Sequence, residues 1–96
     1  MSNFKSKEIM AAAITLASAH GYRNITREQV ATLAEVGNGT VSNVLGTVKQ
    51  MRLAIVRHGV RTGNQTIIAQ GAVFGEPYVV RKVSIDDRLA AMRSVL

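Results

Sequence analysis

Residues 26–45, TREQVATLAEVGNGTVSNVL, decide the fold of this 96-residue chain. The stretch opens with Thr26, and Gln29 follows three residues later, which is the form of a capping box. A capping box predicts that a helix begins directly after Thr26. Residues 37–39, with the sequence GNG, permit a sharp turn because glycine and asparagine tolerate positive φ angles. The stretch therefore predicts two successive short helices joined by a tight turn.

Apolar residues in this stretch recur at the spacing that gives each short helix one inward face. The first helix is expected to end near Glu35 or Val36, and the second to begin at Asn38 or Thr40. The expected inward residues are Val30, Leu33 and Ala34 in the first helix and Val41, Val44 and Leu45 in the second. Polar side chains are left on the outer face of the second helix, where another molecule can reach them.

Further helical patterns follow along the chain. We expect helices over 6–19, from Val48 to Gly59 or Thr62, over 65–74, and from Ser84 to about Val95. Ser6 and Ser84 are expected to cap the first and last of these, with Leu89, Met92 and Val95 inward in the last. Residues 78–80, Tyr-Val-Val, favour a short extended segment. The sequence thus predicts an all-α fold, a compact helical domain with a helix-turn-helix head over 1–50 and a helical dimerisation region over 51–96.

Composition excludes several classes of function. The chain has no cysteine, which rules out disulfides, zinc bound by thiolates and a cysteine nucleophile. Four aromatic residues and no tryptophan disfavour a stacking surface for single-stranded nucleic acid. No apolar run approaches the ~18–20 residues that a membrane span needs, and residues 9–19 lack a convincing cleavage context. We therefore expect a cytoplasmic protein.

Positive charge is concentrated in one part of the chain. Lys and Arg number 12 against 6 Asp and Glu, a net charge of +6, and residues 48–82 carry six of the bases against one acid. A block of this kind is typical of a surface that binds a polyanion, most often nucleic acid. Charge alone leaves a second interpretation equally open, namely a solvated helix face.

No constellation of residues indicates catalysis. His20 and His58 lack metal-ligand companions, and Asp86-Asp87 is better explained as a capping pair than as a catalytic one. The glycine-rich string at 36–40 lacks the lysine and the preceding strand of a phosphate-binding loop. We expect no enzyme activity, no cofactor and no metal.

Several short motifs over residues 9–51 together indicate one type of helix-turn-helix head. They are Ile9-Met10-Ala11-Ala12-Ala13, His20-Gly21-Tyr22, Thr26, Val30-Ala31, Gly39-Thr40-Val41 and Lys49. Together they resemble the DNA-binding head of the tetracycline-repressor family, and residues 30–45 are also similar to the headpiece of the lactose-repressor family. Both families usually place glycine where this chain has Glu35. About 45 residues follow the head, fewer than a ligand-binding domain of the tetracycline family needs, so no small-molecule effector is expected.

The resemblance implies contacts with double-stranded DNA. The expected DNA-binding residues are Thr26, Arg27, Asn38, Gly39, Thr40, Ser42, Asn43, Lys49 and Arg52. Asparagine can pair with adenine through two hydrogen bonds, so Asn43 is expected to read a base. Lys49 and Arg52 are expected to bind DNA phosphates. The N-terminal end of the second short helix is expected to attract phosphates as well. Thr26 has the alternative role of a simple helix cap, and Ser42 and Asn43 that of solvated side chains.

These observations favour a homodimeric repressor that acts on a two-fold DNA site, of the kind that controls a plasmid or phage operon including its own gene. One recognition helix reads only a few base pairs, so tight binding calls for two heads. A small domain also has little interior for the apolar residues of its second half, which a second copy would cover. Two alternatives remain: a protein-interaction module such as an antirepressor or partition adaptor, and a nonspecific architectural DNA-binding protein.

Overall fold

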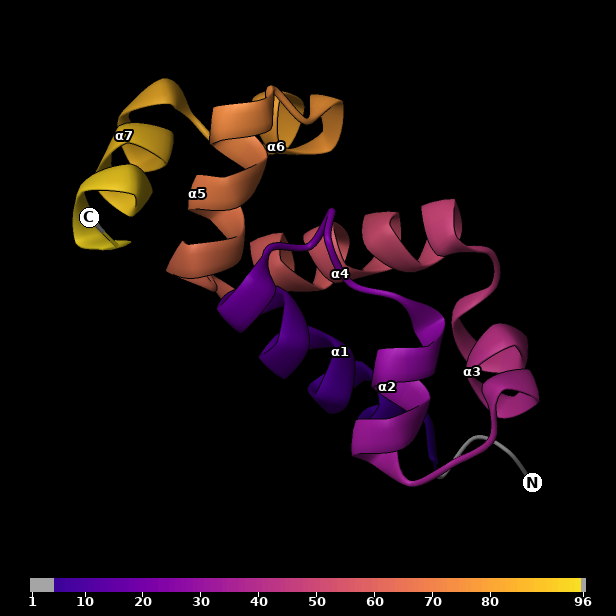
Figure 1. Ribbon diagram of the computed structural model, residues 1–96. Helices are drawn as coiled ribbons and strands as arrows, with labels where there is room; N and C mark the ends of the chain where they lie inside the picture. The colour runs from indigo at the N-terminus through magenta and orange to yellow at the C-terminus, as the bar shows by residue number, and fades with distance from the viewer. Residues whose placement is uncertain (1–4, 96) are drawn as a thin grey trace. The chain divides into compact units, whose positions relative to one another are not determined.

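The computed structural model describes residues 5–95, and all regular structure within that range is α-helical. The described helices are α1 (Ser6–His20), α2 (Arg27–Ala34), α3 (Asn38–Leu45), α4 (Val48–Thr62), α5 (Gln65–Phe74), α6 (Pro77–Lys82) and α7 (Ile85–Val95) (Figure 1). The all-α class predicted from the sequence is confirmed. None of the helices over 5–95 combines the length and apolarity that crossing a membrane requires.

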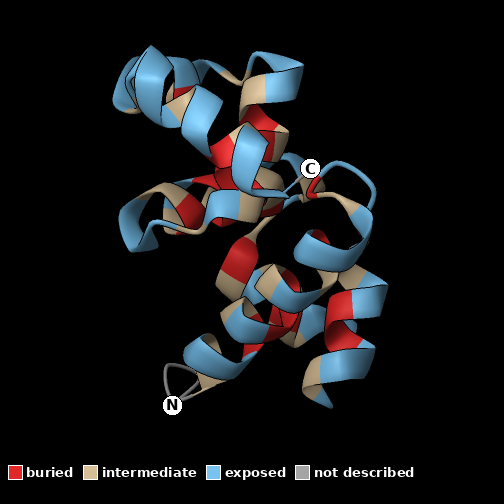
Figure 2. Cartoon of the chain, turned by 90° about the vertical axis from the view of Figure 1, so that its left-hand side faces the viewer, coloured by how far each residue is buried: buried red, intermediate tan, exposed pale blue. Residues whose placement is uncertain are grey.

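Contacts divide the chain into two units, Met1–Ile55 and Val56–Leu96, with the division inside α4. In the first unit α1, α2 and α3 contact one another in every pairing. Their buried side chains, with those of the first half of α4, make its core, and Figure 2 shows these buried residues confined to one side of each helix. The fully buried large residues are Ile9, Ile25, Val30, Val41, Met51 and Ile55.

The predicted capping box at the start of α2 is confirmed. The backbone N–H of Gln29 donates to Oγ1 of Thr26 at 3.2 Å, and the backbone N–H of Thr26 donates to Oε1 of Gln29 at 2.8 Å. Two backbone donors at the helix start are satisfied in this way, because the first turn of a helix has no intrahelical acceptors for them.

The same Thr-x-x-Gln pattern fixes the start of α4. The N–H of Gln50 donates to Oγ1 of Thr47 at 3.1 Å, and the N–H of Thr47 donates to Oε1 of Gln50 at 2.9 Å. The folded-back side chain of Gln50 occupies the space beside Gly46, where a Cβ would overlap it. Gly46 also has φ 81°, so both its backbone and its surroundings require glycine.

Glu35 closes α2 in the left-handed conformation, with φ 59° and ψ 46°. It is the one residue other than glycine with positive φ among the described residues. The N–H of Val36 donates to the carbonyl of Ala31 at 3.0 Å, which satisfies a carbonyl in the last turn of α2. This conformation favours glycine, the residue that the two repressor families usually have at this position.

In the second unit α5 contacts both α6 and α7 (Figure 1). Two close approaches depend on glycine. A Cβ on Gly71 of α5 would lie 2.5 Å from Cγ2 of Val79 in α6, and a Cβ on Gly59 of α4 would lie 2.5 Å from Cγ2 of Ile67 in α5. These glycines therefore let the helices approach more closely than any other residue would.

Two local predictions were wrong. Residues 78–80 are helical rather than extended, because Pro77 begins α6 and the fully buried Val79 packs beside Gly71. Ser6 does not cap the first helix: it lies inside α1, whose N-cap position is Lys5 with no capping side chain. Ser84 does cap the last helix, since its Oγ accepts from the N–H of Asp87 at 3.1 Å.

The inward face of α7 also differs from the prediction. Leu89 and Val95 are each 44% exposed, whereas Ala91 is fully buried and Met92 lies half-buried. A face centred on Ala91 suits close packing on α5, because a small side chain lets the two helix backbones approach. The larger apolar residues are consequently displaced toward the surface.

Candidate nucleic-acid interface

Helices α2 and α3 follow each other across a turn of three residues, 35–37, and contact each other. Val41 and Leu45 of α3 are buried, which fixes the inward face of that helix. Asn38, Gly39 and Asn43 are exposed, while Thr40 and Ser42 are half-buried. Gly39 and Asn43 are four residues apart and so lie on one face of α3. No atom lies within 4 Å of a Cβ built on Gly39, so the backbone there is open to a ligand.

Arg27 at the start of α2 ties this helix to the far end of α3. Its Nη1 donates to Oγ of Ser42 at 3.1 Å and to the carbonyl of Gly46 at 3.2 Å. The guanidinium group therefore crosses the helix pair and satisfies a carbonyl at the C-terminal end of α3. Arg27 and Ser42, two of the predicted DNA-binding residues, are brought together by a contact within the protein.

Other predicted residues near the two helix starts also have internal roles. The hydroxyl of Thr26 accepts the capping bond of α2, although the residue itself is exposed. The N–H of Thr40 donates to the carbonyl of Gly37 at 3.1 Å. Asn38, Gly39 and Asn43 are the exposed predicted residues of α3, and the side chains of Asn38 and Asn43 form no hydrogen bond with another described residue.

The two predicted phosphate-binding cations differ in their surroundings. Lys49, the second residue of α4, is exposed. Arg52 is half-buried, and its Nη2 lies 3.5 Å from the carbonyl of Ile25, in the loop before α2. Its Nε is enclosed by protein and has no hydrogen-bond partner in the part of the chain described here. Arg52 thus lies against the α1–α2 loop, whereas Lys49 is open to solvent.

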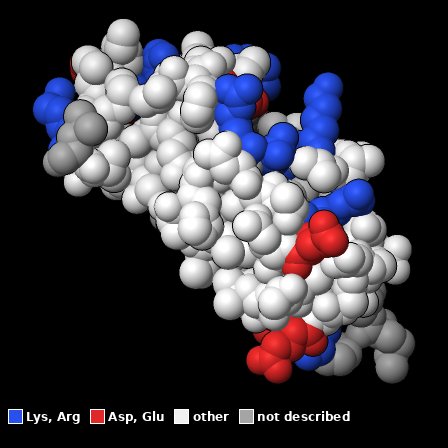
Figure 3. Space-filling model, viewed as in Figure 1, with Lys and Arg blue, Asp and Glu red and all other residues white. Residues whose placement is uncertain are grey.

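The basic block at residues 48–82 is divided between the two units. Lys49 and Arg52 lie in the first, and the other four cations lie in the second, where the guanidinium carbon of Arg57 sits 5.5 Å from the ring centre of Tyr78. Figure 3 shows Lys and Arg side chains, and also Asp and Glu side chains, at the surface of the protein. The block in the sequence is thus shared by the two units and is not confined to the start of α4.

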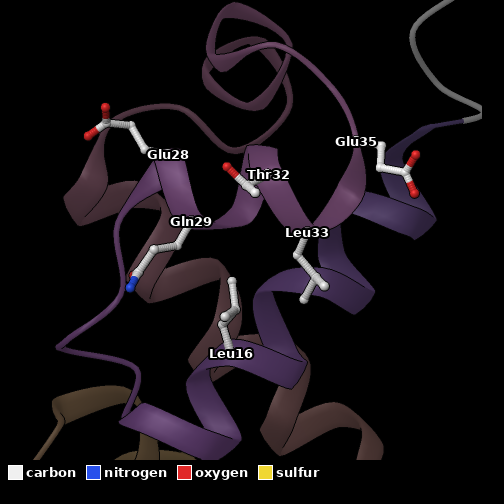
Figure 4. A pocket seen from close by; sticks show the side chains of 6 residues that line it. All are labelled: Leu16, Glu28, Gln29, Thr32, Leu33 and Glu35. Carbon is white, nitrogen blue, oxygen red and sulfur yellow. The ribbon is translucent and has the colours of Figure 1, made fainter.

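Leu33 corrects the predicted inward face of α2. It is 48% exposed and lines a shallow hollow beside α1 with Leu16, Gln29 and Thr32, bordered by Glu28 and Glu35. Figure 4 shows Leu33 and Leu16 pointing toward one another, with the two carboxylates at its ends. The buried face of α2 is centred on Val30 and Ala31 instead, where the helix packs against α1 and α3.

Sequence reasoning did not anticipate the contact between Arg27 and Ser42 or the role of Gln50. The role of Gln50 had a signal in the sequence, the repeated Thr-x-x-Gln pattern. The Arg27–Ser42 contact had no such signal, because it joins residues 15 positions apart. Within residues 5–95, no group of three or more His, Asp or Glu side chains is placed to hold a metal ion. No protein-family model, no curated protein and no solved structure matches this chain.

Proposed function

We propose that this protein is a sequence-specific DNA-binding regulator that inserts α3 into the major groove. The proposal extends to a homodimeric repressor in the cytoplasm that acts on a two-fold DNA site and controls a plasmid- or phage-type operon including its own gene. The pair α2 and α3 has the short turn and the packed second helix by which helix-turn-helix proteins present a recognition helix. This part of the chain is also where the sequence resembles two repressor families.

The observation that carries the proposal is the division of α3 into an anchored face and an open one. Val41 and Leu45 hold one side in the core, and Arg27 fixes its C-terminal end. The opposite side presents Gly39 and Asn43, which combine close backbone approach with an amide that can pair with a base edge. A short polar face of this kind on a rigidly held helix suits reading of bases in the major groove.

Phosphate contacts would complete the interface. Lys49 follows α3 closely and is exposed, so its ammonium group can reach a backbone phosphate. The half-buried Arg52 and the hydroxyl of Thr26, both used within the protein, would have a smaller part in binding. This distribution favours base reading by α3 with positioning by the start of α4.

A selection from a random duplex library tests the proposal with the full chain. We expect enrichment of one short motif, in two copies with inverted symmetry, and gel-shift binding that resists unrelated competitor DNA. The DNA upstream of the coding sequence should contain the same motif. Binding that every competitor abolishes equally would indicate a nonspecific DNA-binding protein. No retention of any duplex would leave the protein-interaction module as the better account.

A further inference from the structure

The second unit carries an apolar surface whose composition is unusual for a helix exposed to water. Helix α5 has no charged residue in ten positions, and its buried residues are Ile67, Ile68, Ala69 and Gly71. The other side is also weakly polar. Val73 is 69% exposed and Phe74 is 51% exposed. Large apolar side chains on the outer side of a helix are normally covered by another element.

The residues of this surface in α5 follow the spacing of one helix face. Thr66, Ala69, Gln70 and Val73 of α5 recur at i, i+3, i+4 and i+7, and they line a hollow together with Phe74 of α5 and Met92 and Val95 of α7. We call these seven residues the α5–α7 patch. Ile85 and Leu89 extend it along α7, seven and three positions before Met92, and both are exposed.

We infer that the α5–α7 patch is the surface through which two copies of this chain pair. No residue that lines the patch is charged, although the chain has a net charge of +6. Two positively charged copies can therefore meet here without placing like charges against each other, whereas a charged partner would find no complementary group. Scattered single apolar residues are normal on a protein surface, but a contiguous patch on two adjacent helices marks an interaction site.

Small and large residues of the patch occupy different parts of α5. Thr66 and the buried Ala69 lie in the first half of the helix, and the large apolar residues Val73 and Phe74 lie at its C-terminal end. In a two-fold pair the same patch serves on both copies, so the large residues of one can enter the hollow of the other. Pairing would bring α5 and α7 of both copies into one four-helix contact.

The test uses the same substitution at two sites of one unit. Val73→Glu changes the most exposed residue of the patch, and Val80→Glu changes a residue of α6 that is 43% exposed and lies outside it. We expect wild-type chain to sediment at twice its mass of 10.3 kDa. Val73→Glu should weaken pairing by at least about a hundredfold, because an unpaired carboxylate would be buried, and Val80→Glu should leave pairing unchanged.

Two controls separate this inference from folding and from the proposed function. Helical circular dichroism at a concentration where all variants are monomeric shows whether Val73→Glu folds. Self-association is measured without DNA, and binding to a duplex with a single half-site is measured separately, so DNA binding can fail while pairing stands. A wild-type chain that stays monomeric at high micromolar concentration would overturn the inference. The inference would also be overturned if Val80→Glu prevented pairing while a correctly folded Val73→Glu chain still paired.

Discussion

Glu35 holds a backbone conformation that its own side chain makes unfavourable. In the left-handed region the Cβ of an L-residue crowds the following carbonyl, a cost that glycine does not have. The chain nevertheless turns at this residue, because the contacts of α2 and α3 with each other and with α1 require the turn. The sequence indicated this position only through the glycine that the repressor families it resembles usually have there, and propensity alone would have placed the turn at 37–39.

Substituting Glu35→Gly should therefore stabilise the protein. We expect a gain of about 0.5–1 kcal/mol, since relief of the left-handed strain is partly offset by the greater freedom of glycine in the unfolded chain. Urea denaturation at fixed protein concentration measures the change. Glu35→Ala is the control, because it removes the carboxylate from the helix end but keeps the Cβ, and it should gain about 0.3 kcal/mol at most. Equal gains from both variants would show that charge, not backbone strain, governs this position.

Element boundaries were predictable wherever a local signal fixes them. The Thr26 box, the glycines that follow α1 and α3, and the Ser84 cap are interactions between residues near in sequence, so a pattern can reveal them. Helix α6 was not predictable in this way. Its two adjacent valines favour an extended chain, and helix formation depends on burial of Val79 beside Gly71, a contact between different elements.

Gly71 tests that dependence on packing between elements. Gly71→Ala should cost about 1–3 kcal/mol, because the new methyl group would overlap Cγ2 of Val79. In a Val79→Ala background the cost should fall below about 1 kcal/mol, since the overlapping Cγ2 is gone, the Cβ of residue 79 remains 3.3 Å away, and alanine is the better helix former. The two backgrounds are compared by urea denaturation. If Gly71→Ala has the same effect in both, α5 and α6 do not approach as closely as described.

At the scale of the whole molecule, the sequence shows which residues are apolar but not which of them meet solvent. Leu33 and Leu89 fit an inward pattern and are exposed, because the position of each helix depends on neighbours distant in sequence. The candidate site shares this limit. The open face of α3 could be predicted from the alternation of apolar and polar residues. The bonds from Arg27 to α3 could not be predicted, because they depend on the three-dimensional arrangement of the helices.

Lys49 provides a prediction about long-range electrostatics. If its ammonium group contacts a phosphate, Lys49→Ala should lower the slope of log affinity against log salt by about one unit, on specific and random duplexes alike. Lys82→Ala removes the same charge from an exposed site in α6 and should leave the slope unchanged, although net charge falls equally. Equal changes in slope from the two variants would mean that net charge, rather than a contact at the start of α4, determines the salt dependence.

The central claim is that the open face of α3 reads bases, and the affinity ratio between a selected duplex and its scrambled counterpart tests it most directly. Fluorescence anisotropy at one salt concentration gives this ratio for the wild-type chain and for Asn43→Ala. We predict that the wild-type chain prefers the selected duplex. Asn43→Ala should lose about 1–3 kcal/mol on that duplex and almost nothing on the scrambled one. Equal losses on both duplexes, or a wild-type ratio near one, would contradict base reading by α3.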